Sequence, residues 1–295
     1  MNEYRYAAKE DLATLKTLWA LTFNDPKPFI DFYFANRFNP ENTLLLIREQ
    51  QITSMLTKIP VGLVTPEGKF DGAMFYAIAT HPQFQKQGLA TFLIEFANQG
   101  LVEAKKDFSV VVPANRGLFG FYLRQGYRES FSIVQRIIKA EELQGVAFSK
   151  GMDLSLEPIA PKLYNSTRQE FLKEQSFIDY PEEEVAQQQK LSRFSGADLY
   201  SIKPGPGGEI SGLMIVERIS KERVIIKECL AAEEFLLPAV KELAGSLPAK
   251  EYFLRVPNFS GSPLKESPTP FAVIKNLGQE ELLSNRRAYL GLAFD

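Results

Sequence analysis

The residues best suited to chemistry lie in a polar loop between a predicted strand and a predicted helix. The loop follows an apolar segment at 77–80 and enters a periodic segment that begins at Gly88. Backbone N–H groups at the start of a helix have no partner within the helix, so such a loop can bind an anion. Gly88 and Ala90 leave room for a phosphate group close to the backbone. The loop is therefore a candidate phosphate cradle, and an ordinary strand-to-helix turn is the alternative.

Other nucleophilic and nucleotide-binding patterns are missing from the chain. The loop lacks the Gly-Lys-Ser/Thr of a P-loop and the three spaced glycines of a dinucleotide fold. His81 is the single histidine, which excludes Ser-His-Asp and Cys-His mechanisms. Because it precedes a proline, we interpret His81 as structural, with phosphate contact as the alternative. Cys229, the single cysteine, lies in an apolar run, which indicates a buried small hydrophobe, and we expect no metal site.

The composition indicates a soluble globular chain of about two domains. The 295 residues include 34 basic and 36 acidic side chains, a formal net charge of −2, and 45% are hydrophobic. This near-neutral balance argues against nucleic acid or an anionic membrane as the main partner. The chain shows no signal segment and no apolar run near the ~18 residues of a membrane helix, so we expect a cytoplasmic protein.

Alternating helical and extended patterns predict the elements that position the loop. Apolar residues at offsets of three and four indicate helices at 10–23, 28–38 and 88–104. Asn115 is placed to cap a further helix that runs to about Arg124 and ends at Gly126. The predicted strands of this half are 43–48, 53–64, 73–80, 108–112 and 127–139.

The second half repeats this order of elements. Residues 111–115 (VVPAN) and 254–258 (LRVPN) echo each other, and both stretches follow a strand–helix pair. We therefore predict an α/β protein with mixed α+β sheets, built from two diverged copies of one unit over residues 1–140 and 151–295. The predicted elements of the second copy are helices at about 158–175, 181–194 and 231–243, strands at 224–230 and 252–256, and a turn between two strands at 204–208.

Two motifs resemble those of the GCN5-related N-acetyltransferase (GNAT) family. The family's pyrophosphate motif, Arg/Gln-x-x-Gly-x-Gly/Ala, is matched by Gln85, Gly88 and Ala90. A second family block, an Asn followed by a Tyr and a Gly-aromatic pair, is matched by Asn115, Tyr122, Gly126 and Tyr127. The resemblance covers about residues 70–130. It implies two tandem GNAT-like domains, acetyl-coenzyme A (acetyl-CoA) as the donor and an amine as the acceptor.

The resemblance also implies roles for the matched positions. Backbone at the strand end would pair with the pantetheine arm, and loop amides would hold the pyrophosphate. Tyr122 would protonate the departing thiolate, with core packing as the alternative, and Asn115 would contact the pantetheine or adenosine part. The implied cofactor-binding residues are Ile78, Ala79, Thr80, Gln85, Lys86, Gln87, Gly88, Leu89, Ala90, Thr91 and Asn115. Residues that could line an acceptor pocket or the core are Phe29, Phe32, Tyr33 and Phe34.

Some positions depart from the family pattern. Lys86 replaces a common glycine and Gln85 the commoner arginine, which predicts modest phosphate affinity. Residues 75–79 lack the glutamate that many members use as general base, so water, backbone carbonyls or another carboxylate must accept the amine proton. The tandem plan resembles the first two domains of the enhanced-intracellular-survival type of acetyltransferases, in which the terminal carboxylate is the base. Asp295 is the corresponding candidate.

The second copy is predicted to be degenerate. Residues 231–234 are too short for a phosphate loop, and Pro257, Pro263, Pro268 and Pro270 disfavour a counterpart of the Tyr122 helix. We predict an N-acetyltransferase in which a primary amine of a small molecule or peptide attacks the thioester directly, without an acyl-enzyme. The alternatives are a coenzyme-A-binding sensor or regulatory module without turnover, and an interaction protein with two degenerate copies. The oligomeric state is not predicted.

Overall fold

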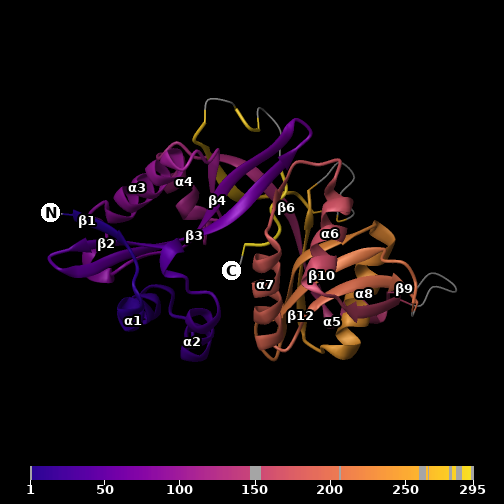
Figure 1. The fold of residues 1–295 in the computed structure, drawn as a ribbon. Coiled ribbons are helices and arrows are strands. Elements are labelled where there is room, and N and C mark those ends of the chain that lie inside the picture. The colour runs from indigo at the N-terminus through magenta and orange to yellow at the C-terminus, as the bar shows by residue number, and fades with distance from the viewer. Residues whose placement is uncertain are drawn as a thin grey trace. The chain divides into compact units, whose positions relative to one another are not determined.

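The computed structural model describes residues 2–146, 154–205, 207–258, 264, 266–278, 281–283 and 288–293. Its contacts divide the chain into two compact units (Figure 1). Unit 1 comprises Met1–Leu63, Gly68–Glu129 and Ala272–Ser284, and unit 2 comprises Val64–Glu67, Ser130–Phe271 and Asn285–Asp295. The sequence suggested one boundary near 139–151, whereas the contacts interleave the two units along the chain.

Unit 1 has a mixed sheet with the strand order β1-β2-β3-β4-β5-β13. The pairs β1–β2, β2–β3 and β5–β13 are antiparallel, and β4–β5 is parallel. The parallel pair requires a crossover, which α3 provides. The elements are β1 (Asn2–Tyr6), α1 (Leu12–Phe23), α2 (Lys27–Asn36), β2 (Thr43–Arg48), β3 (Gln51–Thr65), β4 (Gly68–Thr80), α3 (Leu89–Glu103), β5 (Phe108–Val111), α4 (Arg116–Leu123) and β13 (Thr269–Asn276), with short 3-10 turns η1 (Lys9–Asp11), η2 (Pro40–Asn42) and η3 (Pro82–Phe84).

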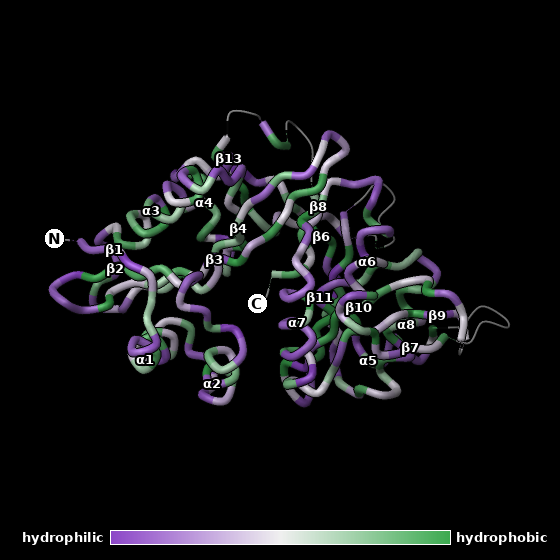
Figure 2. Tube along the Cα trace, viewed as in Figure 1, coloured by the Kyte–Doolittle hydropathy of each residue, from purple (hydrophilic) through white to green (hydrophobic). Residues whose placement is uncertain are grey.

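The sheet of unit 1 separates two apolar cores. Helices α1 and α2 lie on one face and α3 and α4 on the other (Figure 1). The first core contains Trp19, Tyr33 and Met55, and the second contains Leu93 and Tyr122. Strands are apolar and the β2–β3 hairpin end is hydrophilic (Figure 2), as expected for a sheet covered on both faces with exposed turns.

Unit 2 repeats the arrangement with the strand order β6-β12-β11-β10-β9-β7. Its parallel pair is β11–β12, and α8 is the crossover helix. The β6–β12, β10–β11, β9–β10 and β7–β9 pairs are antiparallel. The elements are β6 (Arg128–Lys139), α5 (Ala140–Gln144), β7 (Leu154–Pro158), α6 (Pro161–Leu172), β8 (Phe177–Asp179), α7 (Glu182–Phe194), β9 (Leu199–Pro204), β10 (Gly212–Arg218), β11 (Arg223–Ala231), α8 (Glu233–Ser246) and β12 (Glu251–Pro257).

The predicted fold class and internal repeat are confirmed. The two strand–helix–strand crossovers, β4-α3-β5 and β11-α8-β12, are the clearest expression of the repeat. The sequence analysis missed β1, β7, β8 and β13; β13 contains Pro270, one of the prolines that argued against a helix in this segment. In the described part of the chain, no helix has the length and apolar character needed to span a membrane.

Candidate functional site

The end of β4 differs from a regular strand. Ala77 has a φ of +50°, a left-handed conformation that bulges the strand. As a result Tyr76 and Ala77 both pack toward the α1–α2 core, whereas Phe75 and Ile78 pack toward the α3–α4 core. The parallel register with β5 joins residues 72–75 to 108–111, and β4 continues past the end of β5 to Thr80. The backbone of β4 beyond the bulge therefore has no β5 partner in the described register.

Three residues that are predicted to bind the cofactor lie on this terminal stretch of β4. Ile78 and Thr80 are half-buried, and Ala79 is buried in the α1–α2 core. The Thr80 hydroxyl is 3.0 Å from the Ser54 hydroxyl on β3, and the His81 N–H donates to the Thr53 carbonyl at 2.8 Å. These bonds to β3 fix one edge of β4 where its other edge leaves β5.

The loop after β4 turns sharply into α3. Lys86 and Gly88 both have left-handed backbones, with φ of +62° and +78°. Gly88 is the N-cap residue of α3, and a side chain there would be strained even though Phe92 leaves ordinary room for a Cβ atom. Gln85 donates from Nε2 to the Thr80 carbonyl at 3.1 Å, which closes the loop on itself. The family's common glycine at the position of Lys86 is explained by this backbone conformation.

The start of α3 offers uncapped N–H groups. Gly88 has no side chain that could cap them, and the first intrahelical bond runs from Phe92 to the Gly88 carbonyl. The N–H groups of Leu89, Ala90 and Thr91 consequently have no hydrogen-bond partner among the residues described. No acidic residue lies in the first turn. This geometry favours an anion, and binding at the loop stays a prediction.

Arg48 is a residue of this site that the sequence analysis missed. It ends β2, and its Nη1 donates to Gln87 Oε1 at 2.7 Å. Its other guanidinium donors have no partner within the described residues. An arginine at the end of an apolar strand carries no sequence signal that connects it to a loop beyond two further strands. Arg48 brings positive charge to a loop that has glutamine where the family commonly has arginine.

The second motif lies on α4, which packs on the same core as the start of α3. Asn115 is the N-cap residue as predicted, but its side chain makes no capping bond, which corrects that detail of the prediction. Its exposed amide therefore stays available to a ligand. Tyr122 is 6% exposed and shares the α3–α4 core with Leu89 and, at its margin, Ile78.

Burial dominates the chemistry of Tyr122. Desolvation, with the neighbouring Tyr127 adding to it, raises the pKa of Tyr122 far above the ordinary tyrosine value. Its hydroxyl has no hydrogen-bond partner among the described residues. The ring contacts Phe121 and Tyr127 edge-on, with centroids 5.1 and 5.7 Å apart. The side chain is thus a neutral proton donor whose orientation depends on packing.

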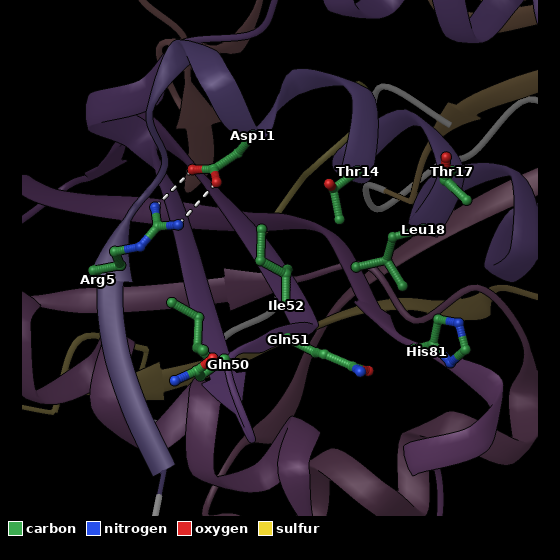
Figure 3. A pocket seen from close by; sticks show the side chains of 10 residues that line it. Arg5, Asp11, Thr14, Thr17, Leu18, Gln50, Gln51, Ile52 and His81 are labelled. Atoms are coloured by element: carbon green, nitrogen blue, oxygen red, sulfur yellow. Dashed lines mark hydrogen bonds and ion pairs between the residues drawn. The ribbon is translucent and has the colours of Figure 1, made fainter.

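The lone histidine has a structural contact. His81 Nδ1 accepts a hydrogen bond from the Gln83 N–H at 3.3 Å, which caps η3. Its ring also lines a pocket of about 490 Å³ (Figure 3). The pocket contains the Arg5–Asp11 ion pair, with contacts of 2.6 and 2.8 Å, and is otherwise lined by uncharged groups. The remaining lining residues are Thr14, Thr17, Leu18, Ile47, Gln50, Gln51 and Ile52.

Other predicted residues are placed as follows. Tyr33 and Phe34 are buried in the α1–α2 core, whereas Phe29 and Phe32 are half-buried. Cys229 is 1% exposed, and burial raises the pKa of its thiol, so the buried-hydrophobe interpretation holds. Asp295 lies outside the described residues.

Neither residues 75–79 nor Asp31 provides a suitable general base on unit 1. Residues 75–79 carry no carboxylate. Asp31 on α2 pairs with Lys16 at 2.7 Å and with Lys27 at 2.5 Å, and these ammonium groups lower its pKa to about 2. A carboxylate that is so weakly basic is a poor acceptor for an ammonium proton.

Unit 2 lacks the corresponding site. Ala232 alone separates β11 from α8, and Glu233 and Glu234 occupy the first helical turn. Two carboxylates at a helix N-terminus repel an anion while stabilising the helix. The second copy is degenerate at this position, as predicted.

The comparisons with known proteins concern the N-terminal domain and the fold. Residues 3–130 match the family model of an acetyltransferase (GNAT) domain. No curated protein matches the chain in sequence. Among solved structures, a GCN5-related N-acetyltransferase from Anabaena variabilis has a TM-score of 0.71 at 18% identity, and covers 94% of this chain and 73% of its own.

Two further structures concern the tandem arrangement. Eis1 from Mycobacterium abscessus has a TM-score of 0.63 at 12% identity, over 93% of this chain and 74% of its own. A tandem GNAT protein from the clavulanic acid biosynthesis pathway has a TM-score of 0.59 at 12% identity, over 95% and 100% of the two chains. The suspected GNAT resemblance of residues 3–130 and the tandem fold are confirmed. Residues 3–130 match an acetyltransferase (GNAT) domain, and the chain as a whole shares its fold with these structures, a tandem GNAT protein among them.

Proposed function

We propose that the chain transfers an acetyl group from acetyl-CoA to a primary amine of a small molecule or peptide. The observation that carries this proposal is the uncapped start of α3 behind the left-handed Gly88, next to a stretch of β4 without a β5 partner. A diphosphate fits the first feature and an amide-bearing arm fits the second. Acetyl-CoA contains both groups and supplies, when bound, an activated acetyl thioester.

The residues that would hold the cofactor follow from this fit. Backbone groups of Ile78, Ala79 and Thr80 would bind the pantetheine amides, and the exposed Asn115 amide would contact the same arm or the adenosine. The diphosphate would take the N–H groups of the loop and the first turn of α3. These residues are Gln85, Lys86, Gln87, Gly88, Leu89, Ala90 and Thr91.

Arg48 would supplement the loop with charge. Its guanidinium already donates to Gln87, and a phosphate oxygen within reach of its remaining donors would make a charge-assisted hydrogen bond. This contact offsets the replacement of the family's arginine by Gln85. The charges of Arg48 and Lys86 together favour a polyanionic ligand.

Tyr122 would act as general acid. The hydroxyl, like that of an ordinary tyrosine, keeps its proton at neutral pH and can donate it from Oη to a departing thiolate. The amine would attack the thioester directly, since Cys229 is buried in unit 2 and cannot serve as an acyl carrier. Asp31 is unsuited to be the base, so the amine must arrive neutral or lose its proton to water, a backbone carbonyl or another carboxylate, for which Asp295 is one candidate.

The absence of a carboxylate on residues 75–79 favours one second candidate, a coenzyme-A-binding sensor without turnover. Both candidates require the same cofactor site, and they differ in whether an acceptor amine reacts. The half-buried Phe29, at the margin of the α1–α2 core, and the half-buried Phe32 on α2 would suit the apolar part of an acceptor. We propose a cytoplasmic location for both candidates.

Thermal unfolding with saturating acetyl-CoA tests the shared part of the proposal. At a hundred times its dissociation constant, a ligand stabilises the fold by about 2.7 kcal/mol, or roughly 5–10 °C for a domain of this size. Gly88→Glu adds a carboxylate and a strained backbone at the anion site and should abolish the shift. A folded wild type with no shift would reject the cofactor site. A shift without thiol release across a panel of amines would favour the sensor.

A further inference from the structure

A buried polar network joins three elements of unit 1 next to Tyr122. Ser109 Oγ on β5 donates to Asn98 Oδ1 on α3 at 2.6 Å. Asn98 Nδ2 donates to Tyr127 Oη at 3.2 Å, and Tyr127 Oη lies 2.9 Å from Ser109 Oγ. None of the three residues is more than 5% exposed. Apolar residues of similar shape would avoid the desolvation cost of these groups, so a specific role is expected for the network.

The number of hydroxyl protons in the network determines which group donates each hydrogen bond. The single Ser109 hydroxyl proton is directed to Asn98 Oδ1, which leaves Ser109 Oγ to accept. Tyr127 must therefore donate to Ser109 while it accepts from Asn98. Burial raises the pKa of Tyr127 to about 12, so this donor stays protonated at neutral pH. The Tyr127 hydroxyl is consequently held by two directional bonds.

Tyr127 also contacts Tyr122, the proposed general acid. Its ring meets that of Tyr122 with an interplanar angle of 71°, and its N–H donates to the Tyr122 carbonyl at 3.2 Å. On β13, Lys275 Nζ lies 5.8 Å from the Tyr127 centroid and donates to the Gln125 carbonyl at 2.8 Å. Tyr127 is thus fixed by α3, β5 and β13, and it contacts Tyr122, whose own hydroxyl has no partner among the described residues.

We propose that Tyr127 is a positioning residue that holds the Tyr122 ring through its hydrogen bonds to Ser109 and Asn98. The proposal rests on the proposed function, in which Tyr122 protonates the thiolate. Since α3 begins at the cofactor site and α4 carries the acid, the network sets the acid relative to the cofactor helix. A general acid must lie within hydrogen-bond reach of its target, and small displacements are costly to turnover.

A double-mutant cycle tests the proposal. Tyr127→Phe keeps the ring and removes both hydrogen bonds of its hydroxyl, and we expect kcat to fall about tenfold with an unchanged KM for acetyl-CoA. In a Tyr122→Phe background there is no acid left to position, so the same substitution should change kcat less than twofold. Equal effects in both backgrounds, or an unchanged kcat in folded Tyr127→Phe, would overturn the proposal. Ser109→Ala, which keeps both rings, should give a smaller loss of the same kind if Tyr127→Phe does not fold.

Tyr252→Phe in unit 2 is the matched control. That buried tyrosine also makes two hydrogen bonds, donating to the Leu247 carbonyl at 3.0 Å and accepting from the Ala249 N–H at 2.9 Å. Its loss should lower stability and leave kcat per folded molecule unchanged. An equal drop in kcat for Tyr252→Phe would assign the Tyr127 effect to general destabilisation and overturn the proposal.

A measurement without turnover separates this proposal from the proposed function. In fluorotyrosine-labelled protein, the resonance of Tyr122 is assigned by its absence in Tyr122→Phe. We expect this resonance to shift and broaden in Tyr127→Phe and to stay unchanged in Tyr252→Phe. An unchanged resonance in Tyr127→Phe would refute the positioning role. If the wild type shows no acetyl-transfer activity but the Tyr122 resonance changes in Tyr127→Phe as expected, only the proposed function is rejected.

Discussion

The crossovers β4-α3-β5 and β11-α8-β12 share one topology and differ in the connection from strand to helix. Both parallel pairs extend over four residue pairs, at 72–75 with 108–111 and at 223–226 with 251–254. In unit 1 residues 81–88 lead into a helix without acidic residues in its first turn, whereas in unit 2 Ala232 leads directly to Glu233 and Glu234. The same scaffold therefore begins its crossover helix without a side-chain cap or acidic residue in one copy and with two carboxylates in the other.

The first strand of each crossover also contains a bulge. The residues at the bulge are uncharged in unit 1 and charged in unit 2. In β4 the residues at the bulge are Tyr76 and Ala77, packed against an apolar core. In β11 the register shift leaves Lys227 as the extra residue, and Lys227 and the adjacent Glu228 are both buried. Glu228 pairs with Arg168 at 2.9 Å, and Lys227 pairs with Glu217 at 2.8 Å. The bulge of unit 2 therefore places charged groups in the interior, where each is paired, whereas the bulge of unit 1 is uncharged and lies beside the proposed ligand.

The buried ion pair of unit 2 gives the largest expected effect. Glu228→Gln leaves the guanidinium of Arg168 buried without a counter-charge and should lower the free energy of unfolding by about 3–5 kcal/mol. Urea unfolding measures this loss. The double variant with Arg168→Met should recover much of it, because neither charge is then buried. A single-variant loss below about 1 kcal/mol would contradict this account of the bulge.

Substituting one buried tyrosine in each unit should affect kcat differently. Tyr122→Phe should lower kcat about a hundredfold, because the general acid is lost, while acetyl-CoA affinity changes less than twofold. Tyr164→Phe in unit 2 removes a hydrogen bond of 2.8 Å to Glu228 and should reduce stability but not kcat. Steady-state kinetics and calorimetric titration measure the two effects. Equal kcat for both variants would remove the catalytic distinction between the units.

The charge at the loop gives a smaller effect. Arg48→Gln should weaken acetyl-CoA binding about five- to tenfold, since a charge-assisted hydrogen bond at an exposed site contributes roughly 1 kcal/mol. The loss should shrink at high salt and should be absent for acetyl-pantetheine, which has no diphosphate. Arg128→Gln is the control, because Arg128 is an exposed arginine that pairs with Glu281. Equal weakening of both ligands would indicate a structural role for Arg48.

The backbone of the loop gives the smallest effect. Lys86→Gly should stabilise the protein by roughly 0.5–1 kcal/mol relative to Lys86→Ala, because glycine adopts the left-handed conformation without strain. Both variants lack the charge, so their difference reports the backbone alone. Thermal unfolding measures it. Identical melting temperatures would mean that the loop is not strained at this position.

Local sequence patterns predicted most of the elements around the site. The helix predicted at 88–104 from apolar residues at offsets of three and four forms as α3 between Leu89 and Glu103. The short connection after β11 was also predicted correctly, since it depends on a few adjacent residues. The side-chain cap expected from Asn115 does not form. The strand β13 was missed because its pattern contains a proline and its partner β5 is distant in the chain.

The sequence by itself determined the repeated α/β order, the family motifs and the loss of the loop in the second copy. These properties depend on residue type and short spacing, which can be read along the chain. Only the tertiary structure brought Arg48 to Gln87, Ser109 and Asn98 to Tyr127, and β13 to β5. Such contacts join residues that are far apart in sequence. They are decided by which surfaces bury together, and no local pattern encodes that choice.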